Sequence, residues 1–267
     1  MRVVRLVVAL LFAVLSSPNL NSQDVASSQR DTQALLILGK MIAATGWNPT
    51  ILPQDAKATG TIARYRGDYQ DSVGLTIKAK GPRLYRADVL DPNGPISTIL
   101  NGDAASVVSS AGTRSEPFHS ALAMRPAVFP FFAGLLAFSD PTIVVQYGGT
   151  ETIADQQCYR VDLSRPSGSS DPLEELRSKA GSLTIWISAK SFLPFQIEYI
   201  RISSDNPSAS RPVIRQYSDY RVVNGFAIPF HQEQRASDQL QQILQLDSVV
   251  FNSGISDTDF ALPVAQD

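Results

Sequence analysis

The sequence contains few side chains suited to nucleophilic catalysis, and none of them forms a recognisable motif. A serine nucleophile needs an adjacent base, usually histidine, and the two histidines of the chain are His119 and His231. Neither is near a Gly-x-Ser-x-Gly elbow, and the sequence has no phosphate-binding loop, no His-Glu-x-x-His motif and no glycine fingerprint for a dinucleotide. We therefore expect a protein without catalytic residues and without a cofactor.

The remaining reactive side chains are better explained by structure than by chemistry. His231 and Glu233 are two residues apart on a predicted strand and share one face, but a zinc site needs three or four ligands, so no metal site is predicted. The acidic pairs at 174–175 and 257–259 are typical of the first turn of a helix and of a solvated loop. Cys158 is the single cysteine, which excludes an internal disulfide, and its strand-like neighbours indicate a buried, unreactive thiol.

Composition indicates an ordinary globular protein with no surface for a polyanion. The chain has 267 residues, of which 43% are hydrophobic and 18% are charged, and this length is enough to bury a sizeable core. The net charge is −2 and the isoelectric point is about 5.7. Proteins that bind nucleic acid or an anionic membrane surface present a basic stripe, so neither is expected as the main partner.

The N-terminus has the three-part layout of a secretory signal peptide. Arg2 and Arg5 precede an apolar run at 6–15, and the polar segment 16–23 follows. The apolar run is too short to span a bilayer as a stable helix. We therefore predict a signal peptide at residues 1–23 and a periplasmic protein. No cysteine directly follows the apolar run, so no N-terminal lipid is expected.

The mature sequence predicts one helix followed by a series of antiparallel strands. Asp31 can cap a helix that runs to about Thr45, with an apolar stripe on one face and a glycine at its end. From Thr59 onward the period changes to two, most clearly at 73–80, and turn-forming residues recur at short spacing. Short connections favour antiparallel neighbours over βαβ crossovers. We expect one mainly β domain over residues 31–263.

The run from Gln216 to Phe230 predicts one long hairpin. Asn224-Gly225 provides the two positive φ angles that a type I′ turn needs, and the twist of that turn matches the twist of the flanking strands. After the turn, Phe226, Ile228 and Phe230 share one face. That apolar face must be buried by a core or by a ligand.

Two helical inserts interrupt the predicted strands. Residues 118–138 are rich in apolar side chains and are broken by two prolines, which predicts one or two short helices. Residues 170–180 predict another short helix, whose charges suit its dipole. The apolar insert is explained either as buried core, the more common fate of such runs, or as a mobile lid over an apolar cavity. A solid and a hollow interior both fit the sequence.

Several stretches occur in the same order as in a known superfamily. They are Lys80–Arg86 with Leu100–Asp103 and Ser106–Val108, Ile185–Ser188 with Phe192–Pro194 and Ile197-Glu198, Tyr217–Tyr220 with Asn224-Gly225 and Pro229-Phe230, and finally Leu246–Asn252 with Asp259–Pro263. In this order they resemble the periplasmic lipoprotein carrier and outer-membrane lipoprotein-sorting superfamily over most of the mature chain. The resemblance implies an unclosed antiparallel β-barrel, or half-barrel, capped by an N-terminal helix and short inserted helices.

In this superfamily the interior of the half-barrel is apolar and resembles a sleeve for acyl chains. The resemblance therefore implies a non-catalytic, monomeric periplasmic carrier, whose partners are lipid or lipoprotein acyl chains and a protein of the outer or inner membrane. Removing acyl chains from water contributes about 0.8 kcal/mol per methylene, so a dry groove is sufficient for capture. The candidate lining and lid residues are Leu75, Ile77, Phe129, Phe131, Phe132, Leu135, Leu136, Ile185, Ile187, Phe226, Ile228 and Phe230.

One position departs from the superfamily pattern. Carriers often have a basic residue directly before the proline of the Lys-x-Pro unit, where it fastens the lid, and this sequence has Gly81 there. Arg83 and Arg86 are the candidate substitutes for that clamp. The superfamily also includes sensors, so the alternative function is a periplasmic sensor or interaction module that binds a protein partner with the same fold.

Overall fold

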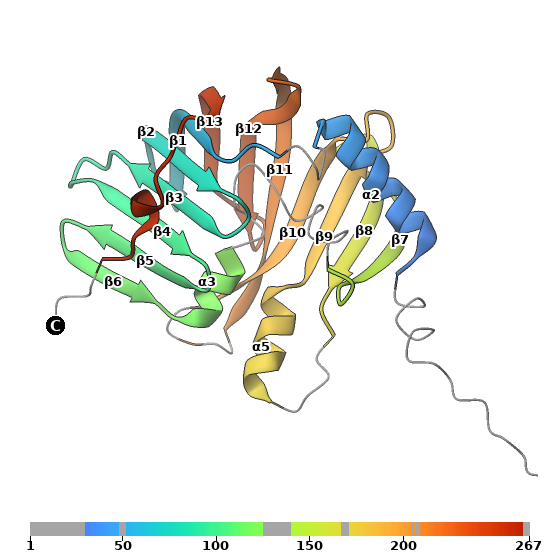
Figure 1. Ribbon diagram of the computed structural model, residues 1–267, viewed down its shortest axis with the longest axis horizontal. Coiled ribbons are helices and arrows are strands. Elements are labelled where there is room, and N and C mark those ends of the chain that lie inside the picture. Colours follow the sequence, from blue (N-terminus) through green and yellow to red (C-terminus); the bar gives the residue numbers. More distant parts are fainter. Residues whose placement is uncertain are drawn as a thin grey trace, which may run out of the picture.

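The computed structural model describes residues 30–47, 52–124, 140–166, 171–203, 206 and 209–263. These residues form one antiparallel sheet with helices packed on it (Figure 1). The strands are β1 (Ala56–Arg66), β2 (Tyr69–Lys80), β3 (Leu84–Val89), β4 (Ile96–Asn101), β5 (Ala104–Ser109), β6 (Gly112–Glu116), β7 (Val144–Ile153), β8 (Gln156–Ser164), β9 (Leu183–Ser188), β10 (Pro194–Ile202), β11 (Ser210–Val223), β12 (Phe226–Ala236) and β13 (Gln239–Phe251). The helices are α2 (Thr32–Thr45), α3 (Phe118–Met124), α5 (Pro172–Ala180) and the short 3₁₀ helix η2 (Asp257–Phe260). The signal peptide predicted at residues 1–23 lies outside the described residues.

The strands follow one another around the sheet in the order β6-β5-β4-β3-β2-β1-β13-β12-β11-β10-β9-β8-β7. All neighbouring strands are antiparallel, and all pairs except β1 and β13 are consecutive along the chain. The pairing of β1 with β13 joins the two parts of the sheet. β6 and β7 are the outermost strands, and within the described residues no pairing joins them. The sheet curves without closing (Figure 1). The predicted unclosed half-barrel is therefore confirmed.

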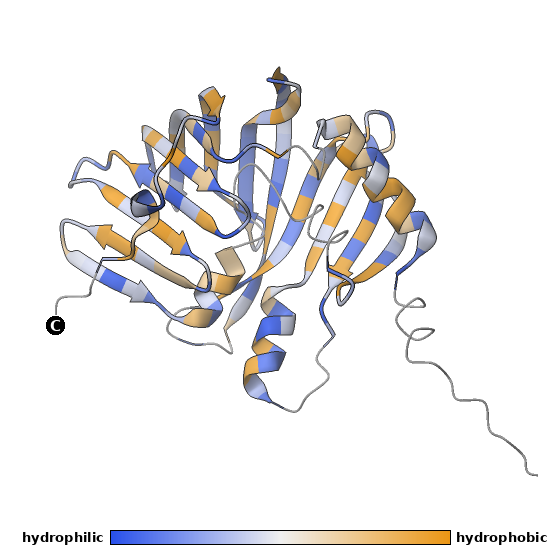
Figure 2. Ribbon diagram, in the orientation of Figure 1, coloured by the Kyte–Doolittle hydropathy of each residue, from blue (hydrophilic) through white to orange (hydrophobic). Residues whose placement is uncertain are grey.

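The sheet buries one face because apolar and polar residues alternate along its strands (Figure 2). In β2 the buried side chains are those of Val73, Leu75, Ile77 and Ala79, with partly exposed residues between them, as the sequence predicts. The register places Ile77 opposite Ala58 of β1, which is also buried. A fully buried valine, leucine or isoleucine side chain contributes about 1.5–3 kcal/mol to the free energy of unfolding.

Helix α2 covers the buried face of the sheet near β7 and β8 (Figure 1). It begins where predicted, because Asp31 accepts a hydrogen bond of 2.9 Å from the backbone N–H of Ala34 and caps the first turn. Leu38 and Met41 are buried against a cluster that includes Val161 of β8. Among the helices described, none has both the length and the apolar character that a bilayer crossing requires.

The end of α2 is fastened to the predicted hairpin turn. Asn224 and Gly225 have φ angles of 49° and 88°, as a type I′ turn requires, and they join β11 to β12. Gly46, which ends α2, has a φ of 74°, and a Cβ there would lie 2.1 Å from the carbonyl oxygen of Gly225. Glycine is therefore required at this close approach. Trp47 continues the contact by packing on Phe226, with ring centroids 4.6 Å apart.

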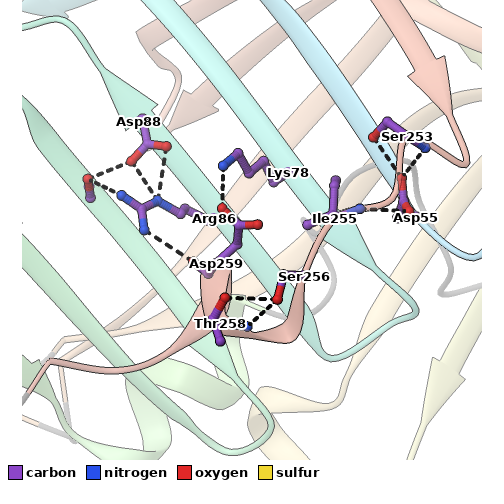
Figure 3. A network of polar contacts seen from close by, with 10 residues as sticks. Asp55, Lys78, Arg86, Asp88, Ser253, Ile255, Ser256, Thr258 and Asp259 are labelled. Atoms are coloured by element: carbon purple, nitrogen blue, oxygen red, sulfur yellow. Dashed lines mark hydrogen bonds and ion pairs between the residues drawn. The ribbon is translucent and has the colours of Figure 1, made fainter.

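A buried carboxylate holds the C-terminal segment to the start of β1 (Figure 3). Asp55 accepts hydrogen bonds from the backbone N–H groups of Ser253 (2.8 Å), Gly254 (3.0 Å) and Ile255 (3.1 Å), and from the Ser253 hydroxyl (2.8 Å). Burial alone would raise the pKa of Asp55, but these hydrogen bonds outweigh burial and lower it. The ionised carboxylate thus fixes a segment about 200 residues away in the sequence.

Candidate ligand-binding cavity

A cavity of about 680 Å³ lies against the curved sheet. Strands β3–β6 form part of its wall, β10–β13 form another part, and helix α3 contributes a third. Strands so far apart in the sheet can share one cavity because the sheet curves, so the cavity lies on the concave face. The volume falls within the range of about 300–1,000 Å³ that is typical of small-molecule sites. The lining residues are Tyr85, Thr98, Val107, Arg114, Glu116, Ser120, Ala123, Met124, Tyr199, Arg201, Ile202, Ser203, Ala209, Ser210, Arg211, Arg215, Gln234 and Gln242.

The lining is polar and basic along the strands. Its charged members among the described residues are the arginines at 114, 201, 211 and 215 and one carboxylate, Glu116. Glu116 accepts from Arg114 at 2.6 Å, and its side chain is only 5% exposed. Positive charge therefore exceeds negative charge on this surface.

Arg215 is held in place by an amide that several donors share. The Gln234 oxygen accepts hydrogen bonds from the Arg215 guanidinium (2.8 Å), the Tyr199 hydroxyl (3.3 Å) and the Gln242 amide (3.3 Å). Burial lowers the pKa of Arg215, but the surrounding tyrosines outweigh burial and raise it. Burial also raises the pKa of Tyr85 in the same wall. At neutral pH the cavity thus presents a charged guanidinium and the neutral phenol of Tyr85.

An apolar patch faces the cavity from the side of α3. Ala123 and Met124 of the helix lie in the lining together with Val107 of β5 and Ile202 of β10. The helix is packed against β5 and β10. The cavity therefore combines a basic wall and an apolar wall, which is the character of a site for an amphipathic molecule.

Where the structure describes them, the apolar residues predicted to line a cavity have a different position. They are buried in two clusters of packed side chains, one around Trp47 and one beneath α2. The cluster around Trp47 contains Leu75, Ile77, Ile228 and Phe230, with Phe226 packed against it, and the cluster beneath α2 contains Ile185 and Ile187. None of these described residues is among those lining the 680 Å³ cavity. Phe129, Phe131, Phe132, Leu135 and Leu136 lie outside the described residues, so ligand contact by this set stays a prediction.

The two candidate lid clamps do not line the cavity. Arg86 follows Tyr85, a lining residue, so its side chain is on the opposite face of β3. There it donates to Asp88 at 2.8 Å and to the backbone carbonyl oxygen of Asp259 in η2 at 3.1 Å (Figure 3). Arg83 pairs with a carboxylate in an exposed turn. In the described structure Arg86 thus holds the C-terminal segment, and a clamp role for either arginine stays a prediction.

The side chains considered for catalysis have structural partners. His119 lies 2.9 Å from the carbonyl oxygen of Ser203, and Nδ1 of His231 lies 2.9 Å from the Gln245 side-chain oxygen. In the described part of the chain, no three His, Cys, Asp or Glu residues are grouped as metal ligands would be. Cys158 is buried and free, and burial raises its pKa to about 11. The predicted burial of this thiol is confirmed.

Sequence reasoning missed the arginines of the cavity, although a signal for them exists. Arg211, Val213 and Arg215 occupy every second position of one strand. Val213 is buried against the core beneath α2, so its two neighbours on the same face also point inward. Charged residues at alternate positions of a buried face are the pattern that would have identified this site.

The structure of this chain is similar to several solved structures. No family model and no curated protein matches the sequence. A LolA superfamily protein from Nitrosomonas europaea superposes with a TM-score of 0.56 at 15% identity, over 85% of this chain and 97% of that one. The chain has the LolA fold. A domain assigned to outer membrane lipoprotein sorting from Vibrio parahaemolyticus gives a TM-score of 0.55 at 12% identity, over 85% and 96% of the two chains. A DUF1329 family protein from Desulfovibrio piger gives 0.55 at 11% identity, over 86% and 96%. At these identities the LolA fold is established, and the function is argued from the cavity.

Proposed function

We propose that the protein is a non-catalytic periplasmic carrier that binds a lipid or a lipoprotein acyl chain inside its LolA fold. The observation that carries this proposal is the cavity of about 680 Å³ on the concave face, with an apolar wall formed by α3, β5 and β10. The periplasmic location rests on the signal peptide predicted at residues 1–23. The name of the Vibrio protein, a lipoprotein-sorting domain, agrees with this role.

Burial of the acyl chain supplies the driving force for binding. Each methylene removed from water contributes about 0.8 kcal/mol, so a few methylenes against Val107, Ala123 and Met124 are worth several kcal/mol. The carrier needs no covalent step, and the two histidines already have hydrogen-bonding partners. A ligand held by burial can also leave intact, which a carrier requires.

Native mass spectrometry of the protein purified from a periplasmic fraction tests the proposal. We expect a mass above that of the polypeptide, and organic extraction should release a lipid that accounts for the difference. A ligand-free mass, combined with no uptake of lipid from detergent micelles, would rule out the carrier. Retention of a protein partner by such a lipid-free protein would instead support the interaction module.

A cavity-filling substitution locates the binding site. Ala123→Phe introduces a ring from α3 into the cavity, whereas Ala111→Phe introduces the same ring in an exposed turn between β5 and β6. Circular dichroism checks that both variants fold. We expect the first variant to lose most of the bound lipid and the second to retain it. Equal lipid content in two folded variants would place the ligand elsewhere.

A further inference from the structure

Two arginines of the cavity lie directly opposite each other on neighbouring strands. Arg201 of β10 and Arg211 of β11 are partners in the antiparallel register, and both line the cavity. We call these two residues the arginine pair. Like charges at directly opposite positions of a sheet destabilise it. Such a pair on the wall of a cavity therefore calls for an anion between its members.

Among the described residues, no carboxylate supplies that anion. In the part of the chain that the structure describes, no Asp or Glu forms an ion pair with either member of the arginine pair. The carboxylate in the lining, Glu116, is nearly inaccessible and is paired with Arg114. Both members of the pair are exposed, and both line the cavity.

The wall behind the arginine pair extends the positive charge inward. Arg215 lies on the same face of β11 as Arg211, with the buried Val213 between them. Its guanidinium is oriented by the hydrogen bond of 2.8 Å to Gln234. Guanidinium groups present planar forks of N–H donors that match the two oxygens of a carboxylate or phosphate. Arg201 lies opposite Arg211, and Arg215 lies on the same face of β11 as Arg211. These three guanidinium groups together form a surface that suits an oxyanion.

We propose that the ligand is an anionic lipid, whose carboxylate or phosphate binds the arginine pair while its chain lies against α3. This inference rests on the proposed function and names the class of lipid. The geometry supports it because the arginines of β10 and β11 and the apolar residues of α3 line the same cavity. An amphipathic molecule can occupy both walls at once.

Matched fluorescent probes test the charge requirement. The probes are a dodecanoic acid with a nitrobenzoxadiazole label and its methyl ester, which differ in head-group charge. For the wild-type protein stripped of lipid we expect the acid to bind at least about tenfold more tightly than the ester, the equivalent of about 1.4 kcal/mol. Arg201→Gln and Arg211→Gln should each reduce that ratio several-fold. Arg66→Gln, at an exposed end of β1 outside the cavity lining, should preserve it.

The outcomes separate this inference from the carrier proposal. Equal binding of acid and ester by the wild type, unchanged in both variants, would overturn the anionic ligand and leave a lipid carrier. If neither probe binds, both proposals fall. Inorganic phosphate alone is added as a competitor: displacement of the acid by phosphate at similar affinity would show a site for free anions and overturn the lipid assignment. A dilauroyl phosphatidic acid probe, compared with dilauroylglycerol, applies the same test to phosphate head groups.

Discussion

Neutralising one member of the arginine pair should make the ligand-free protein more stable, although it weakens binding. Residues at opposite positions of an antiparallel pair have Cβ atoms about 4.5–5.5 Å apart, and Arg201 and Arg211 occupy such positions. Two unit charges about 7 Å apart repel by ~0.6 kcal/mol in water and by ~2.4 kcal/mol at an effective dielectric constant of 20. Because both side chains are exposed, we expect the lower part of this range, about 0.5–1 kcal/mol.

Thermal unfolding followed by circular dichroism measures this effect. For a chain of this size, a gain of about 0.5–1 kcal/mol raises Tm by about 1–4 °C. Arg201→Gln and Arg211→Gln should each show the increase at about 20 mM salt, and it should shrink at about 500 mM salt because salt screens exposed charges. The double variant should gain no more than either single variant, since the first substitution already removes the repulsion.

The control for lost packing is Arg66→Gln, which shortens an exposed arginine that does not line the cavity. It should change the free energy of unfolding by less than about 0.5 kcal/mol. The reasoning is refuted if Arg201→Gln and Arg211→Gln both lower Tm at low salt. It is also refuted if their stabilisation is additive in the double variant, because independent effects would then replace mutual repulsion.

Three further predictions test the framework around the cavity, each by chemical denaturation. Asp55→Ala removes the acceptor of three backbone N–H donors, of which only that of Ile255 forms a buried bond, and should lower the free energy of unfolding by about 1–3 kcal/mol. Because the folded state lowers the pKa of Asp55, the stabilisation by its carboxylate is complete above the pKa of the unfolded chain and is lost as pH falls through the folded pKa. This variant should therefore lose less stability than the wild type on acidification. Gly46→Ala should lower the free energy of unfolding several times more than Gly67→Ala. Both positions have a positive φ, but only at Gly46 would the new Cβ lie 2.1 Å from a backbone oxygen. Equal losses of stability in the two variants would contradict this steric clash. Leu38→Ala should lower the free energy of unfolding by about 2–5 kcal/mol and Leu36→Ala by less than about 1 kcal/mol. The reason is that the Leu38 side chain is fully buried and the Leu36 side chain is 63% exposed. Similar losses in the two variants would contradict the packing of this face of α2 against the sheet.

Local signals predicted the elements, and their order predicted the half-barrel. Asp31 caps α2, and Asn224-Gly225 forms the predicted turn, because each motif acts through bonds or φ angles within a few residues. The pairing of β1 with β13 could not be predicted from local signals, because the paired residues Ala56 and Phe251 are distant in sequence. The hydrogen bonds from the backbone of residues 253–255 to Asp55 could not be predicted from the sequence for the same reason.

Register explains why the arginine pair was not found from the sequence. Arg201 and Arg211 lie on either side of a connection, and their alignment depends on which residues of β10 and β11 face each other. A shift of one residue would turn one side chain to the outer face. The charges are visible in the sequence, but their opposition is a property of the folded sheet.

The inner face of β12 shows where the core ends and the cavity begins. Phe226, Ile228 and Phe230 pack around Trp47, and the alternation then continues with Gln232 and Gln234 on the same face. Both glutamines are buried, and a buried amide needs hydrogen-bond partners, which Gln234 finds in groups that line the cavity. An apolar strand face thus indicates burial without distinguishing packed core from ligand site. Along β12 the change from aromatic to amide side chains leads to Gln234 in the cavity lining, as expected if the proposed ligand has a polar end.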